Sequence, residues 1–444
     1  MENETAPEPM DHDFKAKYER WRWRIFFITW LGYVGFYFTR KAYAVAKIGI
    51  LEDPAIEVSK SALGIVDGAY GVAYALGQFI WGALGDRFGS RRIVLSGMMG
   101  SVVVAILFGL SYHFIIFGLL LFFQGLCQAS GWAPLTKNVS YWFARRERGR
   151  VYGFWSTNYA IGGMLASAFA GYIALMYGTW RAAFFACALV LAGIAGLFWI
   201  LQRNRPEDVG LCEIEEYKGE RRSPQQAGDQ TASEGEGGSL KEILVVLKNP
   251  MILRLAAIYF LLKPTRYAIL FWGPLIVYER LGSNIGESAL ISAVFEAAGP
   301  IGVIFFGYAS DKWFQARRMP AIILGLLVLA GILFSFNTLT SGGGTVSMVI
   351  ALAAVGFFLF GPDALIASTT AVDFGTKKGA GSAAGLINGM GSTGQILGLS
   401  LPGIISSIWG WNVLFNGMGV FVLLAAIILI PKWNAVPADT KGDA

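Results

Sequence analysis

The sequence predicts an all-α membrane protein in which twelve transmembrane helices form two pseudo-symmetric six-helix bundles. Three observations lead to this fold class. Hydrophobic residues make up 55% of the 444 residues and charged residues only 15%, whereas a soluble domain carries about 25% charged residues. Long apolar stretches recur along the whole chain, and mean hydropathy is +0.52. The two halves of the chain also carry matching motifs.

Each predicted helix corresponds to one apolar stretch, since a membrane span needs about 20 mainly apolar residues. In the N-terminal half these stretches are residues 24–46, 62–84, 91–111, 113–136, 149–176 and 181–201. In the C-terminal half they are residues 251–278, 287–309, 318–337, 345–370, 380–407 and 411–431.

A polar segment rich in Gly, Ser, Gln and Glu separates six spans from six, and this composition is typical of a linker. We therefore predict five regions. These are a cytoplasmic N-terminal segment (1–23), a first bundle (24–201), a cytoplasmic linker (202–245), a second bundle (246–432) and a cytoplasmic tail (433–444).

The distribution of Lys and Arg predicts the orientation of the chain. Basic residues gather after the second and fourth spans, at Arg87, Arg91, Arg92, Arg145, Arg146, Arg148 and Arg150. The loops on the other side carry few, chiefly Lys47, Lys60, Arg181 and Arg280. Because cytoplasmic loops are enriched in Lys and Arg, both termini should be cytoplasmic. The N-terminus has no apolar signal core, so a bacterial cytoplasmic (inner) membrane is the expected location, with an organellar membrane as the alternative.

A short motif recurs at the ends of the second and eighth spans. The first copy is Gly82-Ala-Leu-Gly-Asp86-Arg87, and the second ends in Asp311-Lys312; a basic pair follows each copy. A glycine permits close helix approach, and the aspartate can pair with basic groups at a neighbouring helix end. We expect this motif to stabilise one conformation, the alternative being an ordinary solvated loop.

Arg40 and Arg266 lie inside apolar stretches, at corresponding places in the two halves and 226 residues apart. Charged residues inside a membrane span are costly and usually functional. The planar guanidinium fork suits phosphate or carboxylate. The pair therefore predicts an anion held near the membrane midplane between two related halves. Arginines that snorkel from helix ends are the alternative.

Charged neighbours qualify this prediction. Lys263 lies one helical turn before Arg266 and should share its face, or it pairs with Glu296 or Asp67. Pro264 should remove a helical hydrogen bond and kink the seventh span. Lys41 points about 100° away from Arg40, so it need not contact the substrate.

Acidic residues of the spans should neutralise an empty basic site, so that substrate binding becomes an exchange of partners. The candidates are Asp67, Glu296, Asp363 and Asp373. For Asp363 and Asp373, pairing with Lys137 or Lys377 near the span ends is the alternative.

Uncharged residues complete the predicted substrate site. Two tyrosines accompany the arginines, and polar side chains of spans two, five and eleven could bind hydroxyl groups. These candidates are Tyr37, Tyr267, Tyr159, Gln78, Asn158 and Asn388. For any one of them, helix–helix packing is the alternative.

The motif GALGDRFGSRR resembles the loop motif of the major facilitator superfamily. FYFTRKAYAVA, GWAPLTKNVSYWF, RPEDVGL, RYAILFWGP, GPDAL and KKGAGSAAG resemble its organophosphate:phosphate antiporters. The resemblance implies the major facilitator fold and alternating-access exchange of an organic phosphate ester for inorganic phosphate. The ester would be a sugar phosphate, glycerol-3-phosphate or a phosphoglycerate. It also implies that Arg40 and Arg266 hold the phosphate, and Glu296 matches a glutamate of the glycerol-phosphate type.

Two positions depart from the glycerol-phosphate type. Gln78 stands where that type has a lysine, and Tyr159 stands where it has a histidine. The two histidines of the chain, His12 and His113, lie outside the predicted site. A histidine-based proton switch at the substrate is therefore excluded.

We therefore expect a monomeric transporter in the lipid bilayer, with a phosphorylated small molecule and inorganic phosphate as its partners. The chain has no nucleophile–base pair, phosphate loop or metal spacing of its three cysteines, so we expect no enzyme, cofactor or metal site. The net charge of +6 is spread over short loops, which argues against nucleic acid. The alternatives are a proton-coupled symporter of another organic anion, with Glu296 or Asp67 as proton carrier, and a membrane sugar-phosphate sensor. The basic site disfavours efflux of cationic drugs.

Overall fold

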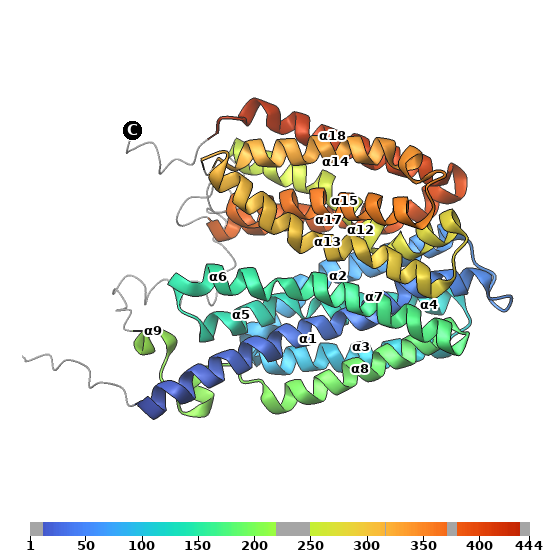
Figure 1. The fold of residues 1–444 in the computed structure, drawn as a ribbon. Helices are drawn as coiled ribbons and strands as arrows, with labels where there is room; N and C mark the ends of the chain where they lie inside the picture. Colours follow the sequence, from blue (N-terminus) through green and yellow to red (C-terminus); the bar gives the residue numbers. More distant parts are fainter. Residues whose placement is uncertain (1–11, 219–248, 316, 371–379, 436–444) are drawn as a thin grey trace, which may run out of the picture.

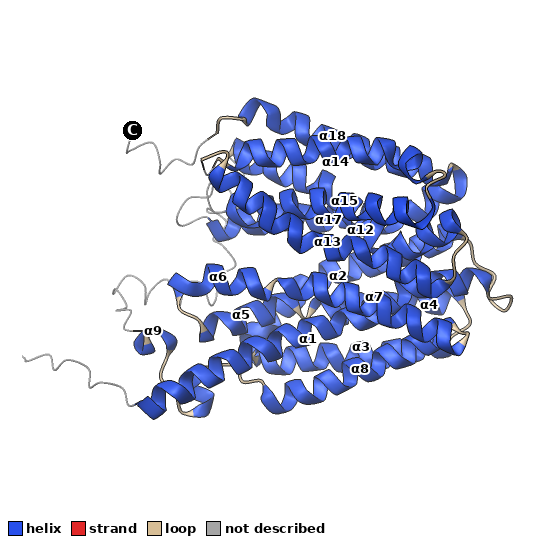
Figure 2. Ribbon diagram, in the orientation of Figure 1, coloured by secondary structure: helices blue, strands red, loops and turns tan. Residues whose placement is uncertain are grey.

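The computed structural model describes residues 12–218, 249–315, 317–370 and 380–435. These residues form long helices joined by short loops, and no strand occurs among them (Figures 1 and 2). The predicted all-α class is confirmed. The N-terminal half, coloured blue to green in Figure 1, lies beside the C-terminal half, coloured yellow to red.

The N-terminal half consists of six long helical segments, two of which are interrupted by turns. The helices are α1 (His12–Glu52), α2 (Lys60–Phe88), α3 (Ser90–Leu110), α4 (Phe114–Ala129), α5 (Trp132–Trp142), α6 (Arg145–Trp155), α7 (Thr157–Tyr177) and α8 (Trp180–Leu201). The predicted span 113–136 is α4 with the start of α5, because the chain turns at Ser130 and Gly131. The predicted span 149–176 likewise joins α6 to α7.

The C-terminal half repeats this arrangement after two short linker helices, η1 (Pro206–Val209) and α9 (Ile214–Tyr217). Its helices are α12 (Pro250–Leu281), α13 (Ile285–Lys312), α14 (Arg318–Thr340), α15 (Gly344–Ala364), η2 (Leu365–Thr370), α17 (Ala380–Ile408), α18 (Gly410–Leu429) and η3 (Ile430–Lys432). The turn η2 is π-helical and extends α15. The helix α12 runs continuously through both Pro264 and Pro274.

Eight helical segments of the described chain are long and apolar enough to cross a membrane. The remaining long helices, α1, α2, α12 and α17, lie where the two halves meet, since α17 packs on α2 and α12 packs on α1. Three of these four carry most of the buried charged residues described below; Glu296 of α13 and Asp363 of α15 are the others. They are less apolar because they surround a polar centre rather than lipid alone.

Contacts between the halves gather in the middle of the molecule and at one end. We call the end near residues 202–218 the linker face and the other end the opposite face. Toward the opposite face, α2 packs on α17 and α7 packs on α13. An added Cβ at Gly64 would lie 2.5 Å from the backbone oxygen of Ser400, so a glycine is needed for this close approach. The halves are therefore tightly joined near the opposite face.

The first turns of α1 extend beyond the predicted span and are held by the linker. The rings of Tyr18 and Tyr217 stack with centroids 3.9 Å apart, and Tyr18 Oη donates to Cys212 O at 2.9 Å. Arg22 Nε donates to Trp142 O at 3.0 Å, and its guanidinium also pairs with Glu147. The start of the linker and the start of α1 are thus attached to the N-terminal half.

The repeated motif at the ends of α2 and α13 is described in part. The environment of Gly82 and the side chain of Asp86 lie outside the described part of the structure, and Arg87 is exposed. In the second copy, Asp311 is exposed and pairs with Arg318. Lys312 Nζ donates to Tyr308 Oη at 2.6 Å. The predicted role in stabilising one conformation stays a prediction.

Candidate substrate site

Arg40 comes from the middle of α1 and is 4% exposed. Its Nε donates to Gln128 Oε1 of α4 at 2.7 Å. The same oxygen accepts from Tyr70 Oη at 2.9 Å, and Gln128 Nε2 donates to Thr39 Oγ1 at 3.1 Å. Gln128 thus orients the Arg40 guanidinium and is itself held by Tyr70 and Thr39. Arg40 has no carboxylate partner among the described residues, and its Nη2 is buried without any hydrogen-bond partner.

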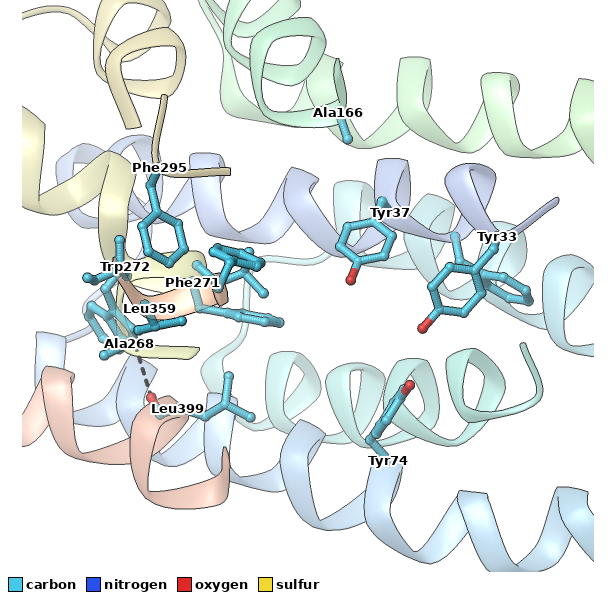
Figure 3. Close-up of a cluster of buried hydrophobic side chains, with 14 of the residues drawn as sticks. Tyr33, Tyr37, Tyr74, Ala166, Ala268, Phe271, Trp272, Phe295, Leu359 and Leu399 are labelled. Atoms are coloured by element: carbon cyan, nitrogen blue, oxygen red, sulfur yellow. Dashed lines mark hydrogen bonds between the residues drawn. The ribbon is translucent and has the colours of Figure 1, made fainter. Parts of the chain in front are cut away.

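Tyrosine rings surround the Arg40 guanidinium. Its Cζ lies 4.6 Å from the ring centroid of Tyr37 and 5.2 Å from that of Tyr74. Figure 3 shows Tyr33 and Tyr37 pointing from α1 to the side on which Tyr74 points up from α2. The aromatic faces stabilise the cation and leave its terminal nitrogen unoccupied.

Arg266 of α12 occupies a similar aromatic setting but has a different polar partner. Its Cζ lies 4.9 Å from the ring centroid of Tyr159 and 4.5 Å from that of Phe360. Its Nη1 donates to Asp363 Oδ2 at 2.7 Å, and its Nε is buried without a partner. The two arginines therefore differ, since only Arg266 has a built-in counter-anion among the described residues.

Asp363 also binds Lys263, whose Nζ lies 3.0 Å from Asp363 Oδ1. One carboxylate thus joins two cations that are one turn apart on α12. The alternative pairing of Lys263 with Glu296 or Asp67 is wrong, and so is pairing of Asp363 at a span end. Asp363 lies in the last turn of α15, which η2 extends to Thr370, and it is buried at 4% exposure against Lys263 and Arg266 of α12.

The two arginines belong to one electrostatic constellation. Tyr37 lies within electrostatic range of both Arg40 and Arg266. Glu296 of α13 also lies within range of both. That the two arginines hold one anion between the halves stays a prediction.

Lys41 is a central residue that the sequence reasoning set aside. It is 3% exposed, and its Nζ lies 2.8 Å from Glu296 Oε2 across the two halves. Lys41 Nζ also donates to Leu270 O at 2.8 Å. Pro274 has no N–H and cannot donate to that carbonyl four residues earlier. Lys41 therefore replaces a helical donor of α12 with a donor from the other half.

Lys47 and Asp67 form a second buried pair, with 2.5 Å between Nζ and Oδ2 and no exposure of either side chain. Lys47 Nζ also donates to Phe271 O at 3.0 Å and lies 3.8 Å from the ring centroid of Trp272. The assignment of Lys47 to a loop is wrong, because α1 continues to Glu52. Asp67 pairs with this lysine and not with Arg40, Arg266 or Lys263.

The other predicted residues lie at varied positions around this centre. Asn158 is fully buried, and neither atom of its side-chain amide has a hydrogen-bond partner. The ring of Tyr267 is half-buried and stacks on Phe271 at 6.3 Å. Gln78 is half-buried on α2, and Asn388 is exposed on α17. Asp373 and Lys377 lie outside the described residues.

Sequence reasoning also missed Gln128. A polar residue inside the fourth apolar stretch was a usable signal, because uncharged polar groups in spans need partners. The sequence could not show that this partner would be Arg40, which lies 88 residues earlier.

Comparison with known proteins identifies the fold family. Residues 29–392 match the model of the Major Facilitator Superfamily. The chain belongs to this superfamily. Within it, the prediction of the organophosphate:phosphate antiporter family is confirmed by full-length relatives. Members of this family are membrane transporters and related proteins and not enzymes, as expected.

Two relatives of this antiporter family cover nearly the whole chain. A "Probable hexose phosphate transport protein" of Chlamydia pneumoniae is 30% identical over 97% of this chain and 95% of its own length. The "Membrane sensor protein UhpC" of Salmonella typhimurium is 32% identical over 97% of this chain and 96% of its own length.

A solved structure supports the same superfamily fold. It is that of a bacterial homologue of the human lysosomal transporter Spinster, with a TM-score of 0.70 over 93% of this chain and 95% of that one. Its sequence identity is 15%, so this likeness concerns the major facilitator fold alone.

Proposed function

We propose that this protein exchanges an organic phosphate ester, such as a hexose phosphate, for inorganic phosphate by alternating access. The observation that carries the proposal is the state of Arg40. Its guanidinium is buried, it has no carboxylate partner among the described residues, and its Nη2 has no hydrogen-bond partner. A buried cation without compensation is strongly unfavourable, so an anionic ligand is the expected partner.

The position of Arg266 supports a phosphate that is shared by the two halves. Both arginines interact electrostatically with Tyr37 and Glu296, and Arg266 Nε lacks a partner as well. An incoming phosphate with three acceptor oxygens can engage both guanidinium groups. Asp363 then stays paired with Lys263, while the Arg266 guanidinium donates to the phosphate of the substrate.

Burial of the Asn158 amide supports a polar organic moiety. Both of its side-chain atoms are unpartnered and shielded from water. Hydroxyl groups of a sugar or polyol can both donate to and accept from an amide. We assign Asn158, with Gln78, Asn388, Tyr159 and Tyr267, to contacts with the substrate during the transport cycle.

Access to the site follows from the packing of the halves. Their contacts gather in the middle and at the opposite face, and we infer from this that substrate reaches the site from the linker face. The excess of Lys and Arg at the linker face supports its assignment to the cytoplasm. We therefore place the protein in a bacterial cytoplasmic membrane with both termini inside, acting as a monomer.

A second candidate function is sensing. The sensor relative is as similar to this chain as the transport protein is, so overall similarity favours neither. A sensor would bind the phosphate ester at the same arginines without exchanging it.

Uptake of radiolabelled phosphate into phosphate-loaded proteoliposomes tests these proposals. We expect rapid exchange that unlabelled hexose phosphate inhibits. Loss of a hydrogen bond to a charged group is worth about 1.5–3 kcal/mol, which is roughly 10- to 150-fold in binding. Arg40→Ala and Arg266→Ala should lower exchange at least this much, and Arg40→Lys should lower it less.

Arg254→Ala is the matched control, because Arg254 lies on α12 three turns before Arg266 toward the linker face. Normal exchange in Arg40→Ala or Arg266→Ala would refute the assigned site. Binding of hexose phosphate without exchange would establish the sensor. A requirement for a pH gradient, without stimulation by internal phosphate, would establish proton-coupled symport.

A further inference from the structure

The positive and negative charges that are buried within the spans do not cancel. Among the described residues, five cations are buried there: Arg40, Lys41, Lys47, Lys263 and Arg266. Three anions are buried with them: Asp67, Glu296 and Asp363. Two positive charges are therefore left uncompensated.

The ion pairs show where this excess lies. Lys47 with Asp67 and Lys41 with Glu296 are each neutral as pairs. Arg40 contributes one uncompensated charge. The group of Lys263, Arg266 and Asp363 contributes the other, because one carboxylate serves two cations there. Each half thus offers one positive charge to a ligand at the centre.

We propose that this protein takes phosphate monoesters of uncharged sugars or polyols and rejects those with an additional carboxylate, and that Asp363 sets this preference. This inference rests on the function proposed above. A phosphate monoester carries about −1.5 to −2 charges near neutral pH, which matches the two uncompensated cations. A phosphoglycerate brings one more negative charge, which has no cation left to meet it.

The geometry gives Asp363 two ways to exclude that carboxylate. Its Oδ1 lies 3.0 Å from Lys263 Nζ, so the positive charge of this ammonium is already compensated and offers little attraction to a second anionic group. The negative charge of Asp363 also repels a substrate carboxylate that approaches the part of the site formed by the C-terminal half. Specificity of this kind arises from an unfavourable charge placed against the wrong ligand.

Competition against phosphate exchange tests the inference. Wild-type protein in phosphate-loaded proteoliposomes is challenged with glucose-6-phosphate or 3-phosphoglycerate, and the half-inhibitory concentrations are compared. We expect 3-phosphoglycerate to be at least about tenfold weaker. In Asp363→Asn, which frees Lys263, we expect this ratio to fall by about tenfold or more. Equal inhibition of the wild type by both compounds would overturn the proposal.

A double variant separates charge from shape. The double variant Lys263→Met with Asp363→Asn removes one charge of each sign. The site then again has two uncompensated positive charges, so the wild-type preference for glucose-6-phosphate over 3-phosphoglycerate should return. Lys263→Met alone leaves one uncompensated positive charge at the site and should disfavour 3-phosphoglycerate further. If Asp363→Asn does not fold, these two variants and the wild-type ratio decide the matter. If the ratio of half-inhibitory concentrations in the double variant equals that of Asp363→Asn, the preference depends on Asp363 itself and not on the net charge. That result would contradict the charge argument.

Failure of the proposed function has a separate signature. Without phosphate exchange in the wild type, the antiporter function fails irrespective of the ratio. In that case, displacement of radiolabelled phosphate from the purified protein gives the same comparison. Equal displacement by the two compounds would overturn the inference.

Discussion

Lys41 of α1 and Glu296 of α13 form an ion pair that joins the two halves, with 2.8 Å between Nζ and Oε2. The side chains are 3% and 2% exposed, so the pair is shielded from water. Alternating access requires the halves to move apart at one face and together at the other. We therefore expect this pair to separate or change partners during the cycle.

Removing one member of the pair should destabilise this conformation. Breaking a buried ion pair costs about 3–5 kcal/mol, because the remaining charge is uncompensated. We expect Glu296→Gln to lower the melting temperature in detergent and to slow phosphate exchange. The double variant Lys41→Met with Glu296→Gln should recover much of the stability. A double variant no more stable than Glu296→Gln would argue against the pairing.

Gly163 of α7 makes room for the Glu296 carboxylate, since an added Cβ would overlap Glu296 Oε1. We expect Gly163→Ala to weaken the packing of α7 on α13. Ser61 Oγ and Ser407 Oγ lie 2.5 Å apart near the opposite face, so a cysteine pair there reports closure. Disulfide formation between these cysteines should slow in Gly163→Ala. Gly307→Ala is the control, because no atom lies within 4 Å of its added Cβ.

Pro274 determines whether Leu270 O accepts from Lys41 of the other half. In Pro274→Ala, the new N–H can donate to Leu270 O within α12 and compete with Lys41. We expect weaker joining of the halves and a larger population open at the opposite face. Thiol labelling of a cysteine at position 407 should then be faster than in the matched protein with Pro274. Unchanged labelling would show that the lysine bond does not hold the halves.

The contact between α1 and the linker should depend on pH through Glu19, whose Oε1 accepts from Tyr217 Oη at 3.2 Å and lies 3.4 Å from Lys218 Nζ. Burial raises the pKa of its carboxyl, but the hydrogen bond and charge of Arg22 outweigh burial and hold the pKa below its ordinary value of 4.5. A carboxyl with a lowered pKa stabilises the folded contact above its unfolded-state pKa, and this stability is lost as pH falls through the folded value. The contact should therefore be intact above pH 4.5 and weaken below it.

Hydrogen-exchange protection of residues 206–217, corrected for intrinsic rates, measures this effect. We expect a fall in protection at acidic pH in the wild type. Glu19→Gln should show less protection at neutral pH and a smaller change on acidification. Equal pH dependence in both proteins would exclude Glu19 as the titrating group.

The sequence predicted the arginines well because each is a charge inside an apolar stretch, and such a residue is conspicuous without a structure. It predicted Lys41 poorly for a geometric reason. The middle of α1 is buried on nearly all sides, so a side chain about 100° from Arg40 still faces protein. Helical spacing shows which residues share a face of a helix, but it does not show how many faces pack against other helices.

Pairing was less predictable than position. Asp363 lies 97 residues after Arg266, and only the packing of α15 beside α12 brings them together. The repeat relates Arg40 to Arg266 but provides no equivalent of Asp363 near Arg40. The asymmetry of the site thus arises where the two halves have diverged, which internal similarity cannot show.

The charge content of α1 has a consequence for how the protein enters the membrane. Arg40, Lys41 and Lys47 share this one helix, and each charge at a span centre costs about 2.5–3.5 kcal/mol on insertion scales. The carboxylate partners of Lys47 and Lys41, which are Asp67 and Glu296, are synthesised later, in α2 and α13. During synthesis, α1 is therefore a poor membrane segment by itself. Its stable integration must wait for α2, and the neutralisation of Lys41 must wait until the second half of the chain has emerged.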